Sequence, residues 1–404
     1  MNAVVIVAHG LNCHWLGPYG NEWVATPCLD ALACEAIAFD QHFAAIPTVE
    51  GYTASLDPID DLRSAGVRTV LVDDGISRPA DDRSWDAVFK PQMAAHPTRA
   101  DAFLAAIEAA MDGLRDQDRW LLWIETDRLL PPWEVDPETY YHYAGAAAKF
   151  TEDPRKEEEK EETADDDEPD EAEDDVSEVE HDQDAIEPPW NAPPLGRSEA
   201  TSDLSWHRLR NTFAAAVTSF DDEIDVVVQI LRERGLDESA LWLVTSGFGC
   251  PLGEHGHVGP AGSALHEELV HLPLLIRLPK AECGGSRASA FTLTDDLLPT
   301  LLDTFGMPTP ASATGQSLLP VIRGDGPAPR PLVQICIASG DDSERLIRTS
   351  EWAFLKKRTG DATTASLFRK PDDRWEVNDV VQHHLGVVEE FETLLASGKA
   401  SQSQ

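Results

Sequence analysis

The sequence LWLVTSGFGCPLGEHGHVGP, residues 241–260, indicates a buried strand that runs into a glycine-rich loop. Parallel α/β proteins place polar chemistry on such loops, because the strand ends meet at one edge of the sheet. The first loop positions here, Gly247 and Phe248, can neither bind a metal nor transfer a proton. The polar side chains come later in the loop: Glu254, His255 and His257. The stretch predicts an α/β fold in which the start of this loop carries no polar chemistry.

The rest of the chain alternates short apolar runs with helical patterns. Strands are predicted at 3–8, 68–72, 120–125 and 241–245, and helices at 27–36, 99–114 and 209–234. This alternation predicts an α/β fold with a central, mostly parallel sheet covered on both faces. After residue 320, short alternating strands precede a helix at 387–395, which predicts a small antiparallel sheet plus helix. We therefore expect an α/β domain over 1–325 and an α+β subdomain over 326–404.

The charge of the chain argues against some partners. Its 404 residues carry a formal net charge of −41, which would repel nucleic acid and anionic membrane surfaces. Much of this charge lies in residues 152–187, where 21 Asp or Glu accompany only three basic residues. We predict that this acidic insertion is a disordered surface loop of the main domain, because it cannot bury enough apolar surface to fold. A cation-binding or partner-binding role for it is the alternative.

The cysteines and the start of the chain bear on the cell compartment. Six scattered cysteines without a C-x-x-C pair indicate reduced thiols that mostly fill the core, rather than a zinc site or a disulfide framework. The first strand begins at Ala3, which leaves no room for a secretory signal, and no apolar run is long enough to cross a membrane. These features predict a cytoplasmic protein.

Several segments, in order along the chain, resemble the sulfatase family of the alkaline-phosphatase-like superfamily. The opening NAVVIVAHGLNCHWLGPYGNEWVATPCLDALACEAIAF is similar to a family strand that ends in two aspartates and continues to L-G-x-Y-G and T-P-x-L-D. AIPTVE resembles the nucleophile turn, WLLWIETDRLLPPW the strand before D-P-H-x-P-W, and FAAAVTSFDDEIDVVVQILRERGLDESALWLVTS the helix and strand before S-D-H-G. The resemblance covers a little over half of the chain and implies an alkaline-phosphatase-like α/β/α sandwich.

The resemblance also implies a chemistry. In the family, the two aspartates and the Asp and His or Asn of S-D-H-G bind a divalent cation. The nucleophile is a formylglycine made from Cys or Ser, or a Thr in related phosphodiesterases, and Arg, Lys and His hold the sulfate. Carboxylate oxygens suit a hard cation such as calcium, which helps to stabilise the dianionic ester.

The positions of this chain that match that constellation are substituted. The four metal positions fall on His9, Gly10, Gly247 and Phe248. The nucleophile position falls on Thr48, which cannot become formylglycine, and the Arg position falls on Tyr52. The His and Lys positions fall on Leu130 and Pro260. Since losing one charge-stabilising contact typically costs about 10² to 10³ in rate, we expect that the family mechanism does not survive.

Some polar residues remain as candidates for a rebuilt site. Thr48 is the one nucleophile of a family type, and capping a turn is its more ordinary role. The fold should bring further polar residues to the same end of the sheet: His9, His14, His255, His257 and Glu254. Imidazoles with one carboxylate suit zinc better than calcium, and His9 with His255 are the zinc ligands that this hypothesis favours.

The leading hypothesis is a sulfatase-like protein that keeps the scaffold, has lost the catalytic constellation and needs no cofactor. It would act as a binding or interaction protein for a small anionic ligand or a protein partner. The alternative is a working hydrolase of sulfate or phosphate esters with a rebuilt site around Thr48, His9 and His255, which would need a divalent metal. A third possibility is that the acidic insertion is the functional part and the fold its carrier.

Overall fold

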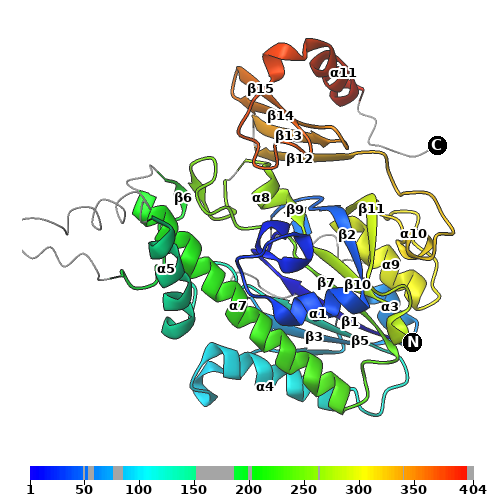
Figure 1. Ribbon diagram of the computed structural model, residues 1–404. Coiled ribbons are helices and arrows are strands. Elements are labelled where there is room, and N and C mark those ends of the chain that lie inside the picture. Colours follow the sequence, from blue (N-terminus) through cyan, green and yellow to red (C-terminus); the bar gives the residue numbers. More distant parts are fainter. Residues whose placement is uncertain are drawn as a thin grey trace, which may run out of the picture.

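The computed structural model contains a nine-stranded main sheet and a four-stranded C-terminal sheet (Figure 1). It describes residues 1–48, 51–52, 59–75, 85–151, 186–198, 203–262, 264–339 and 341–397. The main sheet has the strand order β11-β2-β10-β7-β1-β5-β3-β4, with β9 paired to β2. Its strands are β1 (Asn2–Ala8), β2 (Ile37–Phe43), β3 (Arg68–Asp74), β4 (Ala87–Phe89), β5 (Trp120–Thr126), β7 (Ala240–Thr245), β9 (His271–Leu272), β10 (Leu274–Arg277) and β11 (Ser286–Leu293).

Most strand pairs of the main sheet are parallel. β1 pairs in parallel with β5 and β7, β3 with β5 and β4, and β11 with β2, whereas β9 and β10 pair with their neighbours antiparallel. The residues of β1 from Ala3 to Ala8 are fully buried, which is typical of a parallel strand covered on both faces. The predicted central, mostly parallel sheet is confirmed.

Helices cover both faces of the main sheet. One apolar layer includes α1 (Pro27–Glu35), α4 (Arg99–Asp112), α5 (Pro137–Thr151) and α7 (Asp203–Glu233). The other includes α3 (Ile59–Ser64), α9 (Leu297–Thr304) and α10 (Leu319–Arg323). Val4 and Ile6 of β1 belong to the first layer and Val5 to the second, as the alternation of a strand requires. This arrangement is the predicted α/β/α sandwich.

The C-terminal sheet lies over one end of the main domain (Figure 1). It is an antiparallel meander of β12 (Val333–Ser339), β13 (Asp342–Arg348), β14 (Trp352–Thr359) and β15 (Ala362–Arg369), followed by α11 (Leu385–Ala396). Phe391 of α11 packs against Phe354 and Leu367 on one face of this sheet. On the other face, Leu346 shares an apolar cluster with Phe248 of the main domain. The small antiparallel sheet with a helix agrees with the prediction, and the domain boundary after residue 325 stays a prediction.

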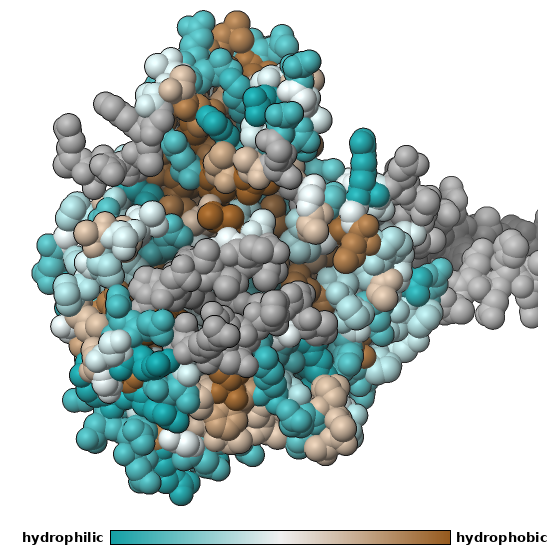
Figure 2. Space-filling view, turned by 180° about the vertical axis from the view of Figure 1, so that it is seen from behind, coloured by the Kyte–Doolittle hydropathy of each residue, from teal (hydrophilic) through white to brown (hydrophobic). Residues whose placement is uncertain are grey.

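The main domain has three further short elements. β6 (Gly196–Arg197) pairs antiparallel with β8 (His257–Val258), and Leu269 and Val270 of α8 (Glu267–Val270) share an apolar cluster with Leu346 of the C-terminal sheet. In the space-filling view from behind, hydrophobic residues show beneath the C-terminal sheet, where it meets the main domain (Figure 2). The junction between the two sheets is therefore partly apolar.

Residues 152–185 of the acidic insertion lie outside the described residues, so its predicted disorder stays a prediction. Among the described helices, none has both the length and the apolar character needed to cross a membrane, and the cytoplasmic location stays a prediction.

All six cysteines are free, but Cys34, Cys283 and Cys336 are exposed, so only half of them fill the core.

Asp221 of α7 allows a test of how the helical layer is held together. Its two carboxylate oxygens accept hydrogen bonds from the backbone N–H groups of Cys28 and Leu29 at the start of α1, both at 2.8 Å. Asp221→Ala leaves these two buried donors without a partner, and we expect it to lower the free energy of unfolding by about 2 kcal/mol or more. Chemical denaturation measures this loss. Asp222→Ala, at the exposed neighbouring position, should change stability by less than about 0.5 kcal/mol, and equal losses in both variants would contradict the assignment.

Candidate functional site

The loops that follow β1 and β7 lie side by side at one end of the main sheet. The backbone N–H of Gly10 donates to the carbonyl oxygen of Phe248 at 2.8 Å, and the N–H of Cys250 donates to Gly10 at 3.0 Å. This pairing continues the parallel contact between β1 and β7 beyond the strands, because Gly10 and Gly249 form an isolated bridge. All four family metal positions therefore lie together, as the resemblance implies.

Aromatic side chains fill the space between these positions. The ring of His9 stacks on Phe248 with the centroids 4.8 Å apart, and Tyr52 meets it edge-on at 5.1 Å. Nε2 of His9 lies 2.8 Å from Oε1 of Glu125 at the end of β5. All four side chains are almost completely buried. Nδ1 of His9 has no hydrogen-bond partner in the described part of the chain, but the rings of Phe248 and Tyr52 lie against the imidazole.

Two glycines make this close packing possible. A Cβ atom at Gly247 would lie 2.7 Å from Cε1 of His9 and 2.9 Å from Cδ2 of Tyr52. A Cβ atom at Gly10 would lie 2.4 Å from the carbonyl oxygen of Leu129, and the φ of +97° at Gly10 is unfavourable for other residues. Ligand-bearing side chains thus do not fit at either position. Calcium requires several oxygen ligands, and the four matching positions offer no carboxylate, so these residues do not fit that ion.

The remaining matching positions have ordinary structural roles. Oγ1 of exposed Thr48 accepts a hydrogen bond from the N–H of Gly51 at 3.0 Å, which is the turn-capping role considered from the sequence. Tyr52 belongs to an apolar cluster on one face of the sheet. Leu130 packs against the cluster around Phe248, and Pro260 lies half-buried in the loop after β8.

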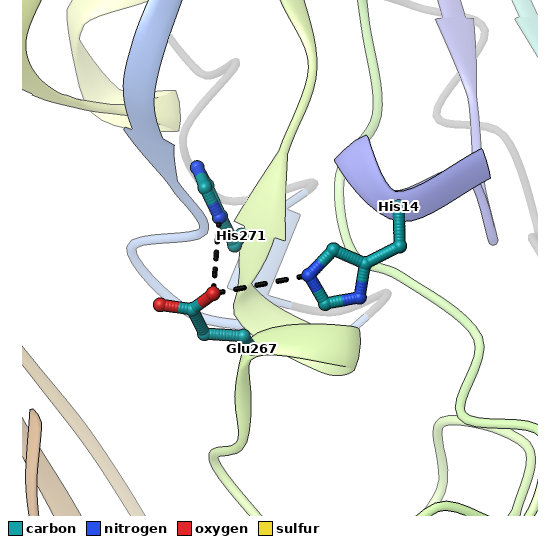
Figure 3. Close-up of side chains that lie close together, drawn as sticks. All are labelled: His14, Glu267 and His271. Carbon is teal, nitrogen blue, oxygen red and sulfur yellow. Dashed lines mark ion pairs between the residues drawn. The ribbon is translucent and has the colours of Figure 1, made fainter. Parts of the chain in front are cut away.

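A first polar cluster forms around Glu267 of α8 (Figure 3). Oε2 of Glu267 lies 3.8 Å from Nε2 of His14, which comes from the loop after β1, and 3.5 Å from Nδ1 of His271 in β9. Oε1 of Glu267 lies 3.2 Å from Nε of Arg348 and 3.0 Å from Nζ of Lys370, both in the C-terminal subdomain. One carboxylate of the main domain is thus surrounded by four basic side chains.

Burial and these neighbours shift the pKa values of the cluster. Burial alone would raise the pKa of Glu267, but His14, His271 and Lys370 hold it well below its usual range. Burial lowers the pKa of His14. Burial also acts to lower the pKa of His271, but the neighbouring Cys13 and Glu267 outweigh it and raise that pKa to about 10. Glu267 therefore stays ionised and interacts with cations from both domains.

A second polar cluster lies closer to the surface. The ring of His255 stacks on His266 with the centroids 3.6 Å apart and the planes 8° from parallel, and Nδ1 of His266 lies 2.6 Å from Oε2 of Glu376. Nε2 of His255 is 3.6 Å from Oε1 of Glu268. Burial, followed by the charge of Glu254, raises the pKa of Glu268 to about 9, and burial lowers that of His255 to about 4. At neutral pH Glu268 holds a proton and His255 is neutral.

The five polar candidates from the sequence are divided among different partners. His9 pairs with Glu125, His14 joins the Glu267 cluster, and His255 joins the His266 cluster. The carboxylate of Glu254 accepts the N–H of Leu252 and faces Arg210, and His257 contacts the carbonyl oxygen of Ala261. The structure thus does not bring His9 and His255 into one site with Thr48.

Sequence reasoning missed the residues that complete both clusters: Glu267, His271, His266 and Glu376. The segment HEELVH, residues 266–271, contained a signal for three of them, because two histidines and two glutamates fall within six residues there. Glu376 gave no such signal, since it is 110 residues from His266 in the chain.

Comparisons with known proteins agree with the fold and with the resemblance. The family model of the sulfatases matches residues 130–307. N-acetylglucosamine-6-O-sulfatase of Bacteroides thetaiotaomicron is 34% identical over 128 residues, which cover 31% of this chain and 23% of that protein. Arylsulfatase K of Danio rerio is 26% identical over 213 residues, which cover 50% of this chain and 40% of that protein. The chain therefore matches less than half of the length of these relatives.

Solved structures show the same architecture over nearly the whole chain. A 2-O glycosaminoglycan sulfatase superposes with a TM-score of 0.69 and 15% identity, covering 98% of this chain and 91% of that one. The phosphonate monoester hydrolase of Agrobacterium radiobacter superposes with a TM-score of 0.68 and 16% identity, covering 98% and 95%. At such identities the likeness shows the fold alone.

The close contact at Gly247 can be tested by adding one methyl group. Gly247→Ala places a Cβ against the rings of His9 and Tyr52, and we expect it to lower the free energy of unfolding by about 1–3 kcal/mol. Gly386→Ala is the matched control, because a Cβ at that position of α11 meets no atom within 4 Å. Denaturant unfolding of both variants measures the difference. A neutral Gly247→Ala would mean that the aromatic packing around His9 is loose.

Proposed function

Because the chain belongs to the sulfatase-like proteins of the alkaline-phosphatase-like superfamily, we propose that it is a non-hydrolytic member that keeps this scaffold for binding or interaction. The observation that carries the proposal is the stack of His9 on Phe248, closed by Tyr52, at the positions that match the family's cation site. This space is filled by buried rings rather than by carboxylate oxygens. A dianionic ester would find neither carboxylates that hold a divalent cation nor a lysine or arginine side chain at these positions.

The expected loss of activity is large. One preorganised charge-stabilising contact is worth about 3–4 kcal/mol in a transition state. Here the positions of the cation ligands, the aldehyde, the arginine, a histidine and a lysine are all substituted. Even if the separate losses do not add, the family mechanism keeps too little stabilisation to act at a useful rate.

A hydrolase rebuilt around Thr48 receives less support. The hydroxyl of Thr48 already accepts the N–H of Gly51, and Thr48 has no histidine partner among the described residues. His9 is held 2.8 Å from Glu125, and its ring is covered by Phe248. A nucleophile needs a base within hydrogen-bond reach, and this geometry does not provide one.

Hydrolysis of a chromogenic aryl sulfate and of an aryl phosphate tests the proposal. We expect the hydrolysis rate of the protein to equal the buffer background, both as purified and after addition of Ca²⁺, Mg²⁺ or Zn²⁺. The Thr48→Ala variant should show the same background rate. A matured sulfatase assayed in parallel shows that the substrates are competent. Hydrolysis at least tenfold above background that disappears in Thr48→Ala would overturn the proposal in favour of a rebuilt site.

The ligand that this scaffold binds is proposed to be a small anion, taken up in a cleft of the C-terminal subdomain. The cleft lies between the four-stranded sheet and α11, has a volume of about 430 Å³, and is lined by Arg345, Lys356 and Arg358. Lys356 also pairs with Glu392 at 2.7 Å, and Arg345 reaches the carbonyl oxygen of Leu395. The chain as a whole has a net charge of −41 and repels anions. Its basic cleft is a place where an anionic group is attracted instead. A protein partner with acidic side chains is the other form of the proposal.

Titration calorimetry with inorganic sulfate and pyrophosphate tests the cleft. We expect measurable binding of one of these anions to the full chain, and at least tenfold weaker binding to the double variant Arg345→Ala, Arg358→Ala. Arg369→Ala is the control, because Arg369 belongs to β15 of the same sheet but does not line the cleft. Absence of binding to the unaltered protein, or equal binding to both variants, would reject a small-anion site here.

A further inference from the structure

Two histidine nitrogens approach one carboxylate oxygen without forming a hydrogen bond to it. Nε2 of His14 is 3.8 Å and Nδ1 of His271 is 3.5 Å from Oε2 of Glu267, and both nitrogens point at that oxygen (Figure 3). Both are buried and have no hydrogen-bond partner among the described residues. The His14 side chain is only 5% exposed. Burying such unpartnered ring nitrogens is costly unless something else satisfies them.

Two other histidine–carboxylate pairs of this chain close to ordinary hydrogen-bond lengths, whereas Nε2 of His255 stays 3.6 Å from Oε1 of Glu268. His9 lies 2.8 Å from Glu125, and His266 lies 2.6 Å from Glu376. The observed gaps of 3.5 and 3.8 Å instead approach the ligand–ligand edge of roughly 3.4 Å in a tetrahedron around zinc. The three ligand atoms all lie within 4.8 Å of one another.

The surroundings hold these ligand atoms in place. Nε2 of His271 lies 2.9 Å from the carbonyl oxygen of Asp40, so this nitrogen carries the proton and donates it. At neutral pH Nδ1 of His271 also carries a proton, because the neighbouring Cys13 and Glu267 raise the pKa of this ring to about 10, and a metal ion that binds Nδ1 displaces that proton. Metal-binding histidines are commonly oriented by such a bond from the other ring nitrogen. On the carboxylate, Oε1 contacts Arg348 and Lys370, which leaves Oε2 toward the two rings.

From this geometry we propose that His14, Glu267 and His271 bind a zinc-type transition metal ion, with Nε2, Oε2 and Nδ1 as ligands. This site is distinct from the family positions at His9, Gly10, Gly247 and Phe248. It does not depend on the proposed loss of hydrolysis. Two nitrogens and one oxygen are a donor set of the kind that zinc prefers, and a water completes four-coordination.

The charge around the cluster selects against hard cations. Arg348 and Lys370 neutralise Glu267, and Lys370 also lies 3.0 Å from Glu376. The site therefore offers little net negative charge, which calcium or magnesium would need along with more oxygen ligands. Zinc gains its affinity from bonds to imidazole, so a nearly neutral surrounding weakens its binding less.

The second polar cluster, around His255 and His266, is a poorer metal site. The rings of His255 and His266 are stacked 3.6 Å apart and only 8° from parallel. The lone pairs of two such rings lie in nearly parallel planes, so they do not meet at one ion. His14 and His271 come instead from separate elements and converge on the same oxygen (Figure 3).

The position of the ion suggests a structural role. His14 follows β1, Glu267 and His271 belong to α8 and β9, and Glu267 is tied to Arg348 of β13 and to Lys370 after β15. Trp375 of the C-terminal subdomain also meets the His14 ring edge-on at 4.5 Å. A bound ion would thus stiffen the junction between the main sheet and the C-terminal sheet.

Metal binding to the full-length, tag-free protein tests the site. After treatment with a chelator and dialysis against micromolar Zn²⁺, we expect one zinc per chain by elemental analysis and a higher melting temperature than for the metal-free protein. His14→Gln and His271→Gln should each weaken zinc binding at least tenfold in a competition with a chromogenic chelator. The controls are His266→Gln, in the second polar cluster, and His257→Gln, which lies outside both polar clusters. Both variants should bind zinc like the unaltered protein.

Cobalt substitution of the unaltered protein gives a second readout that does not require variants to fold. Co²⁺ in the site should show the intense visible absorption of four-coordinate cobalt, which Zn²⁺ removes. No zinc retained by the unaltered protein, or a six-coordinate cobalt spectrum, would overturn the proposal. Loss of zinc in His266→Gln with retention in folded His14→Gln would overturn it as well.

Discussion

The pairing of the loops after β1 and β7 is the constraint on which the rest of the structure depends. The backbones of Gly10, Phe248 and Cys250 bond directly to one another, so neither loop can move without the other. Gly249 also donates to Leu269 of α8, and a Cβ at Gly249 would lie 2.0 Å from the carbonyl oxygen of Glu268. The β7 loop is therefore fixed between the β1 loop and α8. The β7 loop thus lies between the aromatic stack of His9, Phe248 and Tyr52 and the carboxylates of Glu267 and Glu268 on α8.

Phe248 links this constraint to the domain arrangement. Its ring covers His9, and it also belongs to the apolar cluster that includes Leu346 and Phe368 of the C-terminal sheet. An acidic or histidine ligand at this position would instead expose a polar group to that cluster and carry a desolvation cost. Phenylalanine at this position, which matches a family metal position, thus also supplies apolar area to the junction between the two sheets.

Much of the fold could be predicted because its central strands are long buried runs. The sequence predicts the bounds of β1, β5 and β7 to within one residue, since both of their faces are apolar. β2 was not predicted, because Asp40, Gln41 and His42 interrupt its apolar pattern. α7 begins at Asp203 rather than at residue 209, since its first turns precede the regular apolar stripe. The sequence also placed His9 and Phe248 at adjacent strand ends, but it could not show that their rings stack.

The polar clusters were less predictable, because each joins residues that are distant in the chain. Glu267 meets His14 across the main domain and Arg348 across the subdomain junction. No local spacing encodes such contacts.

The substitutions at the family positions are physically consistent as a set. Carboxylates that hold a cation repel one another when the cation is lost, so retaining some of them in a buried site would destabilise the fold. Here all four positions lack a carboxylate, and the one new polar ring, His9, has a partner in Glu125. Because residue 247 is a glycine, the rings of His9 and Tyr52 can approach it closely. Because residue 10 is a glycine, the carbonyl oxygen of Leu129 can do the same there. An aspartate placed at either glycine would therefore meet this packing rather than an open site.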